Sequence, residues 1–148
     1  MADPIHNCIA RWHDFVGGRA PDALDDLLHE DVEFYSPIVF TPQVGRDITK
    51  LYLAAAGGTL GGGNKSAEEK VADKESGGGF KYTKEIMSGN AAMLEFETEM
   101  DGKYVNGVDI ITCNDDGVIT EFRVMIRPLQ AVNLVHAQMK AMLERLQS

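Results

Sequence analysis

The chain has 148 residues, a hydrophobic fraction of 44% and a formal net charge of −9. This length and composition are typical of one globular domain that buries a core of useful size. The acidic excess argues against partners that require clustered Lys and Arg, so we expect neither a nucleic acid nor a membrane surface as a partner.

The first third of the sequence predicts three helices and one strand. A first helix is expected to begin after Asp3, its N-cap, and to end at the glycines 17–18, because apolar residues recur between them at helical spacing. A short second helix is expected after Pro21. Alternating residues at 29–37 predict a strand, and a third helix is expected after Gly45.

The last half of the sequence predicts a meander of strands followed by a helix. The strong hairpin pair Asp101-Gly102 and two further turn signals divide it. The expected strands cover residues 80–87, 91–100, 104–113 and 118–127. Pro128 ends the last strand, and an amphipathic helix is expected over residues 129–146.

Residues 57–79 form a glycine-rich segment between the third helix and the meander. Glycine triplets at 61–63 and 77–79 flank a stretch with too few apolar side chains to offset the entropy of its own ordering. We interpret the chain as a single domain, 1–148, that carries a flexible insert at about 57–79. Both a native loop and a segment introduced by engineering fit the sequence.

Cysteine and histidine usage indicates neither a disulfide framework nor a metal or cofactor site. Cys8 and Cys113 lie in apolar runs outside any CxxC motif, so we expect buried free thiols. The four histidines do not have metal-ligand spacing, and no phosphate-binding glycine motif occurs, so we expect no metal and no cofactor. The N-terminal residues do not have a signal-peptide pattern, and we expect a cytoplasmic location.

Four short motifs resemble the nuclear transport factor 2-like superfamily, which includes SnoaL-like cyclases and ketosteroid isomerases. They are RW at 11–12, EDVEFYSP at 30–37, GRDITKLY at 45–52 and VDIITCNDDGVITEFRV at 108–124. The resemblance implies an α+β fold, a cone-shaped curved antiparallel sheet with three N-terminal helices on its concave side and an additional C-terminal helix. It also implies a homodimer through the sheet face, which outward Val108, Ile110 and Met125 favour as well.

Comparison with ketosteroid isomerases places three residues of this chain at that family's catalytic positions. Trp12 falls at the oxyanion-hole Tyr, Ser36 at the general base and Asp109 at the oxyanion-hole Asp, so one of the three residue types is retained. A Ser cannot abstract a carbon-bound proton unaided. Limonene epoxide hydrolases share the fold, but Phe96, Thr98 and Val124 fall near their Arg and Asp positions.

The strand register predicts a mostly apolar pocket around Asp109, the candidate catalytic residue. Its expected lining is Trp12, Phe34, Ser36, Phe40, Leu94, Phe96, Phe122, Val124 and Ile126. In such surroundings the pKa of the Asp109 carboxyl should rise, and the group should bond to Trp12, Ser36, a water or a ligand. The sequence thus predicts a small-molecule-binding domain of the SnoaL-like type. The alternatives are a small isomerase, cyclase or hydrolase acting on an apolar carbonyl or epoxide compound, and an engineered scaffold.

Overall fold

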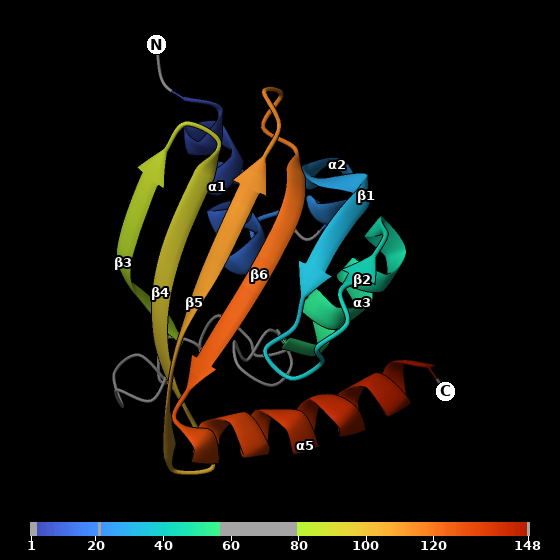
Figure 1. The fold of residues 1–148 in the computed structure, drawn as a ribbon, viewed down its shortest axis with the longest axis vertical. Coiled ribbons are helices and arrows are strands. Elements are labelled where there is room, and N and C mark those ends of the chain that lie inside the picture. The colour runs from blue at the N-terminus through green and yellow to red at the C-terminus, as the bar shows by residue number, and fades with distance from the viewer. Residues whose placement is uncertain (1–2, 21, 57–79, 148) are drawn as a thin grey trace.

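A curved six-stranded sheet forms the centre of the molecule, and helices cover its concave face (Figure 1). The structure is a computed structural model that describes residues 3–20, 22–56 and 80–147. The insert predicted at 57–79 lies outside these residues. Within the described part of the chain, no helix has the length and apolar character needed to span a membrane.

The strands follow in the sheet in the order β2-β1-β6-β5-β4-β3. Their bounds are β1 (Leu28–Tyr35), β2 (Gln43–Val44), β3 (Lys81–Ser88), β4 (Ala91–Met100), β5 (Lys103–Cys113) and β6 (Ile119–Arg127). The predicted α+β class and meander are confirmed. The pairing of β1 with β6 is parallel, whereas the sequence suggested an antiparallel sheet throughout, and the two-residue strand β2 was not predicted.

The described helices are α1 (Pro4–Val16), α2 (Leu24–Leu27), α3 (Arg46–Ala56) and α5 (Leu129–Gln147). Asp3 occupies the N-cap position of α1, but its side chain does not cap the helix as predicted. Its Oδ2 instead accepts a hydrogen bond from the backbone N–H of Gly89, at 2.8 Å. This bond ties the start of α1 to the turn between β3 and β4.

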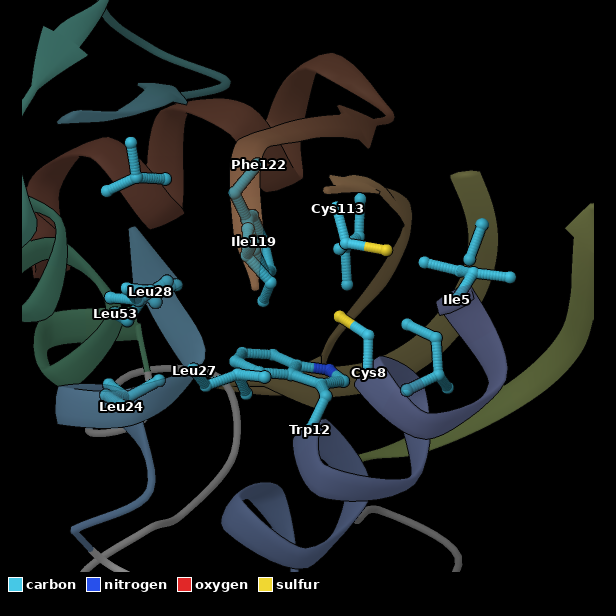
Figure 2. Packing of buried hydrophobic residues seen from close by; sticks show 14 of the residues in the cluster. Ile5, Cys8, Trp12, Leu24, Leu27, Leu28, Leu53, Cys113, Ile119 and Phe122 are labelled. Atoms are coloured by element: carbon cyan, nitrogen blue, oxygen red, sulfur yellow. The ribbon is translucent and has the colours of Figure 1, made fainter. Parts of the chain in front are cut away.

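Two apolar clusters fill the space between the sheet and the helices. The first joins α1 and α2 to the sheet, and Figure 2 shows Trp12 of α1 lying across it toward Phe122 of β6. The second lies at the other end of the sheet, where Ala131, Val135 and Met139 of α5 pack with Phe96 and Val105. Of the apolar face predicted for the last helix, Val135 and Met139 are buried, and Val132 and Leu143 are partly buried.

The register between β4, β5 and β6 decides which side chains enter the concave interior. Asp109 pairs with Leu94 on β4 and with Val124 on β6. Directly opposed residues in a ladder point to the same side of a sheet, so the three side chains face the helices together. The inward orientation that the sequence predicted for Asp109 follows from this register.

Candidate functional site

Asp109 is a carboxyl group buried in an apolar part of the interior. The residue is only 6% exposed, and its ladder neighbours Leu94 and Val124 offer it no hydrogen bond. Burial disfavours the charged form and raises the pKa of Asp109 from 3.8 to about 7, although a hydrogen bond from Tyr82 opposes the shift. Near neutral pH this carboxyl can therefore either donate or accept a proton.

A hydrogen-bonded chain connects α1 to Asp109 through Tyr82 of β3. The indole Nε1–H of Trp12 donates to the Tyr82 hydroxyl at 2.9 Å. The Tyr82 hydroxyl in turn donates to Asp109 Oδ2 at 2.7 Å. Burial first, and then the nearby Asp109 carboxylate, raises the pKa of Tyr82 well above its usual value, so the hydroxyl keeps its proton.

Asp109 Oδ1 has a different environment from Oδ2. Among the described residues, the structure gives Oδ2 one donor, Tyr82, and gives Oδ1 none. A buried carboxylate normally has its lone pairs satisfied. One oxygen of this nearly buried carboxyl is therefore without a hydrogen-bond partner among the described residues.

Sequence reasoning missed Tyr82, which is the direct partner of Asp109. We expected Trp12 or Ser36 to contact the carboxyl, but Trp12 reaches it only through Tyr82. A β-bulge between Tyr82 and Lys84 disrupts the alternation of β3. Tyr82 lies opposite Phe96 in the ladder and points inward. Strand β3 has no continuous apolar side, so its sequence pattern does not indicate which of its residues point inward.

Of two further predicted lining residues, Ser36 makes local hydrogen bonds and Phe40 is exposed. The Ser36 hydroxyl accepts hydrogen bonds from the backbone N–H groups of Ile38 and Val39, at 3.0 and 3.4 Å, and so stabilises the turn after β1. Phe40 is 99% exposed and cannot line an interior pocket. Its aromatic character suggested burial, but it lies in a loop beyond the end of the sheet.

The other predicted lining residues gather on the concave side. Phe34, Leu94, Phe96 and Phe122 are fully buried, Trp12 is nearly so, and Val124 and Ile126 are partly buried. The Trp12 and Phe122 rings meet edge to face with centroids 4.9 Å apart, and Tyr52 of α3 contacts Phe34 at 5.4 Å. That these residues line an open pocket stays a prediction.

A groove of about 360 Å³, open to solvent, lies between α1 and the outer strand β3. Its lining residues are His13, Tyr82, Thr83, Lys84 and Glu85. His13 pairs with Glu85, and the His13 ring meets the Tyr82 ring edge to face. Tyr82 thus belongs both to this groove and to the buried chain that ends at Asp109.

The two cysteines are buried free thiols, as the sequence predicted. Their sulfur atoms face each other between α1 and the end of β5 (Figure 2). Burial raises the pKa of Cys8 to about 12, so this thiol is a poor nucleophile. Among residues 3–20, 22–56 and 80–147, no cluster of three or more His, Cys, Asp or Glu side chains could hold a metal ion.

Comparisons with known proteins give matches at the level of structure. No protein-family profile and no curated protein matches the chain. A steroid delta-isomerase from Pseudomonas aeruginosa matches with a TM-score of 0.82 and 24% identity, over 99% of this chain and 96% of that one. An uncharacterised Silicibacter pomeroyi protein with a cystatin-like fold gives 0.74 and 28%, over 93% and 86%. An NTF2-like protein of unknown function from Mesorhizobium loti gives 0.61 and 20%, over 84% and 92%.

Proposed function

We propose that this chain, which has the nuclear transport factor 2-like fold, is a small-molecule-binding domain in which Asp109 anchors an apolar ligand. The observation that carries the proposal is the Asp109 carboxyl, nearly buried among apolar side chains with one oxygen unpartnered by the described residues. A mostly apolar site with a single polar group is a common form of ligand site. In its neutral form Asp109 would donate a hydrogen bond from Oδ1 to a ligand oxygen.

A binding role fits this chain better than proton-transfer catalysis. An isomerase or cyclase acting on a carbonyl compound needs a base to remove a carbon-bound proton. Ser36, at the corresponding position, already accepts two backbone hydrogen bonds and is not a base near neutral pH. The steroid delta-isomerase likeness, at 24% identity, supports the fold and not the reaction.

Affinity for an apolar ketone should fall as the pH rises above about 7. Ionised Asp109 cannot donate a hydrogen bond, so above the Asp109 pKa the affinity for 2-acetylnaphthalene should fall by the value of that one bond, about tenfold, and then level off. Isothermal titration calorimetry between pH 5.5 and pH 9 would measure this change. Asp109→Asn keeps an N–H donor at every pH, and its affinity should be independent of pH.

The hydrocarbon 2-isopropenylnaphthalene is the matched control ligand, because it has the shape of the ketone without the oxygen. At pH 6 it should bind more weakly than 2-acetylnaphthalene, and the difference in binding free energy should equal the contribution of one hydrogen bond. Equal binding of the two compounds by the wild-type protein, or no binding of either, would contradict the proposed function.

We further propose that two copies of the chain associate through the convex face of the sheet. Ile86, Tyr104 and Met125 are about half exposed on strands β3, β5 and β6, and a contact through this face would bury them. The glutamates of β4 do not pair directly with the arginines of β6. Asn106, on the strand between them, accepts from Arg127 and donates to Glu95.

Sedimentation equilibrium should show a dimer at micromolar concentration, and Met125→Glu should shift it toward monomer. A carboxylate in the centre of the contact would have to lose its water on association, which costs free energy. Leu129→Glu is the control, because Leu129 is 73% exposed at the start of α5 and lies off the sheet face. A wild-type monomer at these concentrations would rule out the dimer.

A further inference from the structure

The two cysteines of the chain lie together although they come from elements that are far apart in the sequence. Cys8 lies on α1 and Cys113 is the last residue of β5, and both are buried in the first apolar cluster. Figure 2 shows their sulfur atoms beside each other between the helix and the sheet. The Cys8 thiol donates a hydrogen bond to the Cys113 sulfur, so the two sulfur atoms are in direct contact.

The backbone of α1 lies close to the end of β5. A disulfide requires that its two Cα atoms lie within about 7 Å of each other. A Cβ built on Gly117, in the turn that follows β5, would lie 3.6 Å from the carbonyl oxygen of Pro4 and 3.8 Å from the backbone nitrogen of Cys8. The first two turns of α1 therefore rest on the backbone of this turn, which is the close approach that a covalent link between the two elements needs.

Backbone hydrogen bonds hold both cysteines through the turn between β3 and β4. The N–H of Cys113 donates to the carbonyl oxygen of Asn90 at 2.8 Å, and Nδ2 of Asn90 donates to the carbonyl oxygen of Cys113 at 3.0 Å. At the start of α1, the N–H of Ile5 donates to the carbonyl oxygen of Gly89 at 3.3 Å. One turn thus anchors the helix start and the strand end, which fixes the separation of the two thiols.

We propose that Cys8 and Cys113 are a disulfide-forming pair, and that their oxidation links α1 covalently to β5. The oxidant is a small-molecule disulfide of the glutathione class. One cysteine thiolate attacks it, which forms a protein–glutathione S–S bond and releases the first glutathione thiol. The other cysteine thiolate attacks the bound cysteine sulfur, which forms the Cys8–Cys113 bond and releases the second glutathione thiol. The two cysteines lose two protons and two electrons, and the glutathione disulfide gains them.

The surroundings of the pair make this reaction depend on the opening of α1. Burial raises the pKa of Cys8 to about 12 and also raises the pKa of Cys113, so little thiolate forms while the helix is docked. Local unfolding of the helix exposes both thiols to the oxidant. Once the S–S bond has formed, α1 cannot leave the sheet. Oxidation therefore converts a helix that can open into one that is held closed.

This change reaches the concave interior through Trp12. Trp12 lies one helical turn after Cys8 on the buried side of α1, and Figure 2 shows both side chains entering the same cluster. The indole Nε1–H of Trp12 donates to the Tyr82 hydroxyl. Opening of α1 breaks this hydrogen bond, so exchange of the indole proton with solvent reports how often the helix opens.

The first measurement is the effective concentration of the two thiols, from the ratio of disulfide to dithiol protein in mixtures of reduced and oxidised glutathione. The value for the folded chain should exceed the value in urea by about 100-fold, because a bond that fits the fold is favoured by the same factor by which it stabilises the fold. Intact mass after acid quenching identifies each form. The disulfide form is lighter than the dithiol by two hydrogen atoms, and a mixed disulfide is heavier.

The second measurement is hydrogen exchange of the Trp12 indole N–H, which gives a single resonance because the chain has one tryptophan. Oxidation should slow this exchange about tenfold. It should also raise the melting temperature by about 10 °C, since the bond closes a long loop of the unfolded chain. The double variant Cys8→Ala, Cys113→Ala is the matched control, and the same glutathione treatment should change neither quantity.

An effective concentration no higher in the folded chain than in urea would overturn the inference, because the native geometry would then not favour the bond. Glutathione that stays attached to one cysteine, or a disulfide that joins two chains, would overturn it too. These outcomes are read from the wild-type protein and do not depend on the folding of a variant. Unchanged indole exchange after the bond has formed would show that the bond does not hold α1 on the sheet.

Discussion

Asp109→Asn is expected to be more stable than the wild-type protein at pH 8 and to lose that advantage at pH 4. The cause is the raised pKa of Asp109, about 7 in the folded chain against an ordinary value of 3.8. Between these values the folded state binds a proton that the unfolded state has released, so the stability of the wild-type protein falls as the pH rises toward 7. Above pH 7 the cost of the buried charge is complete.

The expected size of this effect is large for one substitution. At 1.36 kcal/mol per pKa unit, the shift from 3.8 corresponds to about 4 kcal/mol of unfolding free energy at pH 8. Urea denaturation followed by circular dichroism at pH 4, 6 and 8 would measure it. The exposed Asp116→Asn is the matched control and should show no such trend. A difference between Asp109→Asn and wild type that does not change with pH would contradict a raised pKa.

Gly107→Ala should destabilise the chain by about 3 kcal/mol through overpacking of the concave face. A Cβ at this position would lie 2.5 Å from Cζ of Phe96 and 2.6 Å from the carbonyl oxygen of Met125. The Phe96 ring can move at the expense of its contacts in the second cluster, but the backbone of β6 cannot move without disturbing its pairing with β5. Thermal and urea denaturation would show the loss.

Gly102→Ala provides the comparison for Gly107→Ala. Nothing lies within 4 Å of a Cβ at Gly102, so only its φ of +77° opposes the change, at a cost of about 1 kcal/mol. If Gly107→Ala lowers the free energy of unfolding no more than Gly102→Ala does, then Phe96 does not lie as close to the β5 backbone as the structure places it.

The inward placement of Asp109 could be predicted because β4 and the turn between β4 and β5 carry two consistent local signals. Apolar and acidic residues alternate along β4, and Asp101-Gly102 sets the register of β5 against it through a tight turn in which both residues have positive φ. Counting residues from this turn then tells which side of the sheet each side chain faces. The same counting put Leu94 and Phe96 on the inner side of β4, where both are buried.

The residues that sequence reasoning misplaced lie where these local signals stop. The bulge after Tyr82 changes the alternation of β3, so Tyr82 and Glu85 both turn toward α1 although they are three positions apart. Phe40 lies in a loop where residue type alone does not determine burial. The parallel pairing of β1 with β6 joins segments that are far apart in the sequence, and no local pattern encodes such a contact.

Titration of the Asp109 carboxyl by ¹³C NMR tests most directly whether the interior holds an acid that is half-neutral near physiological pH. The resonance, identified by its loss in Asp109→Asn, should titrate with a pKa near 7. A pKa near 4 would mean that water or a partner group solvates this carboxylate in the folded protein. In that case Asp109 would stay charged at neutral pH and could not donate a hydrogen bond to a ligand.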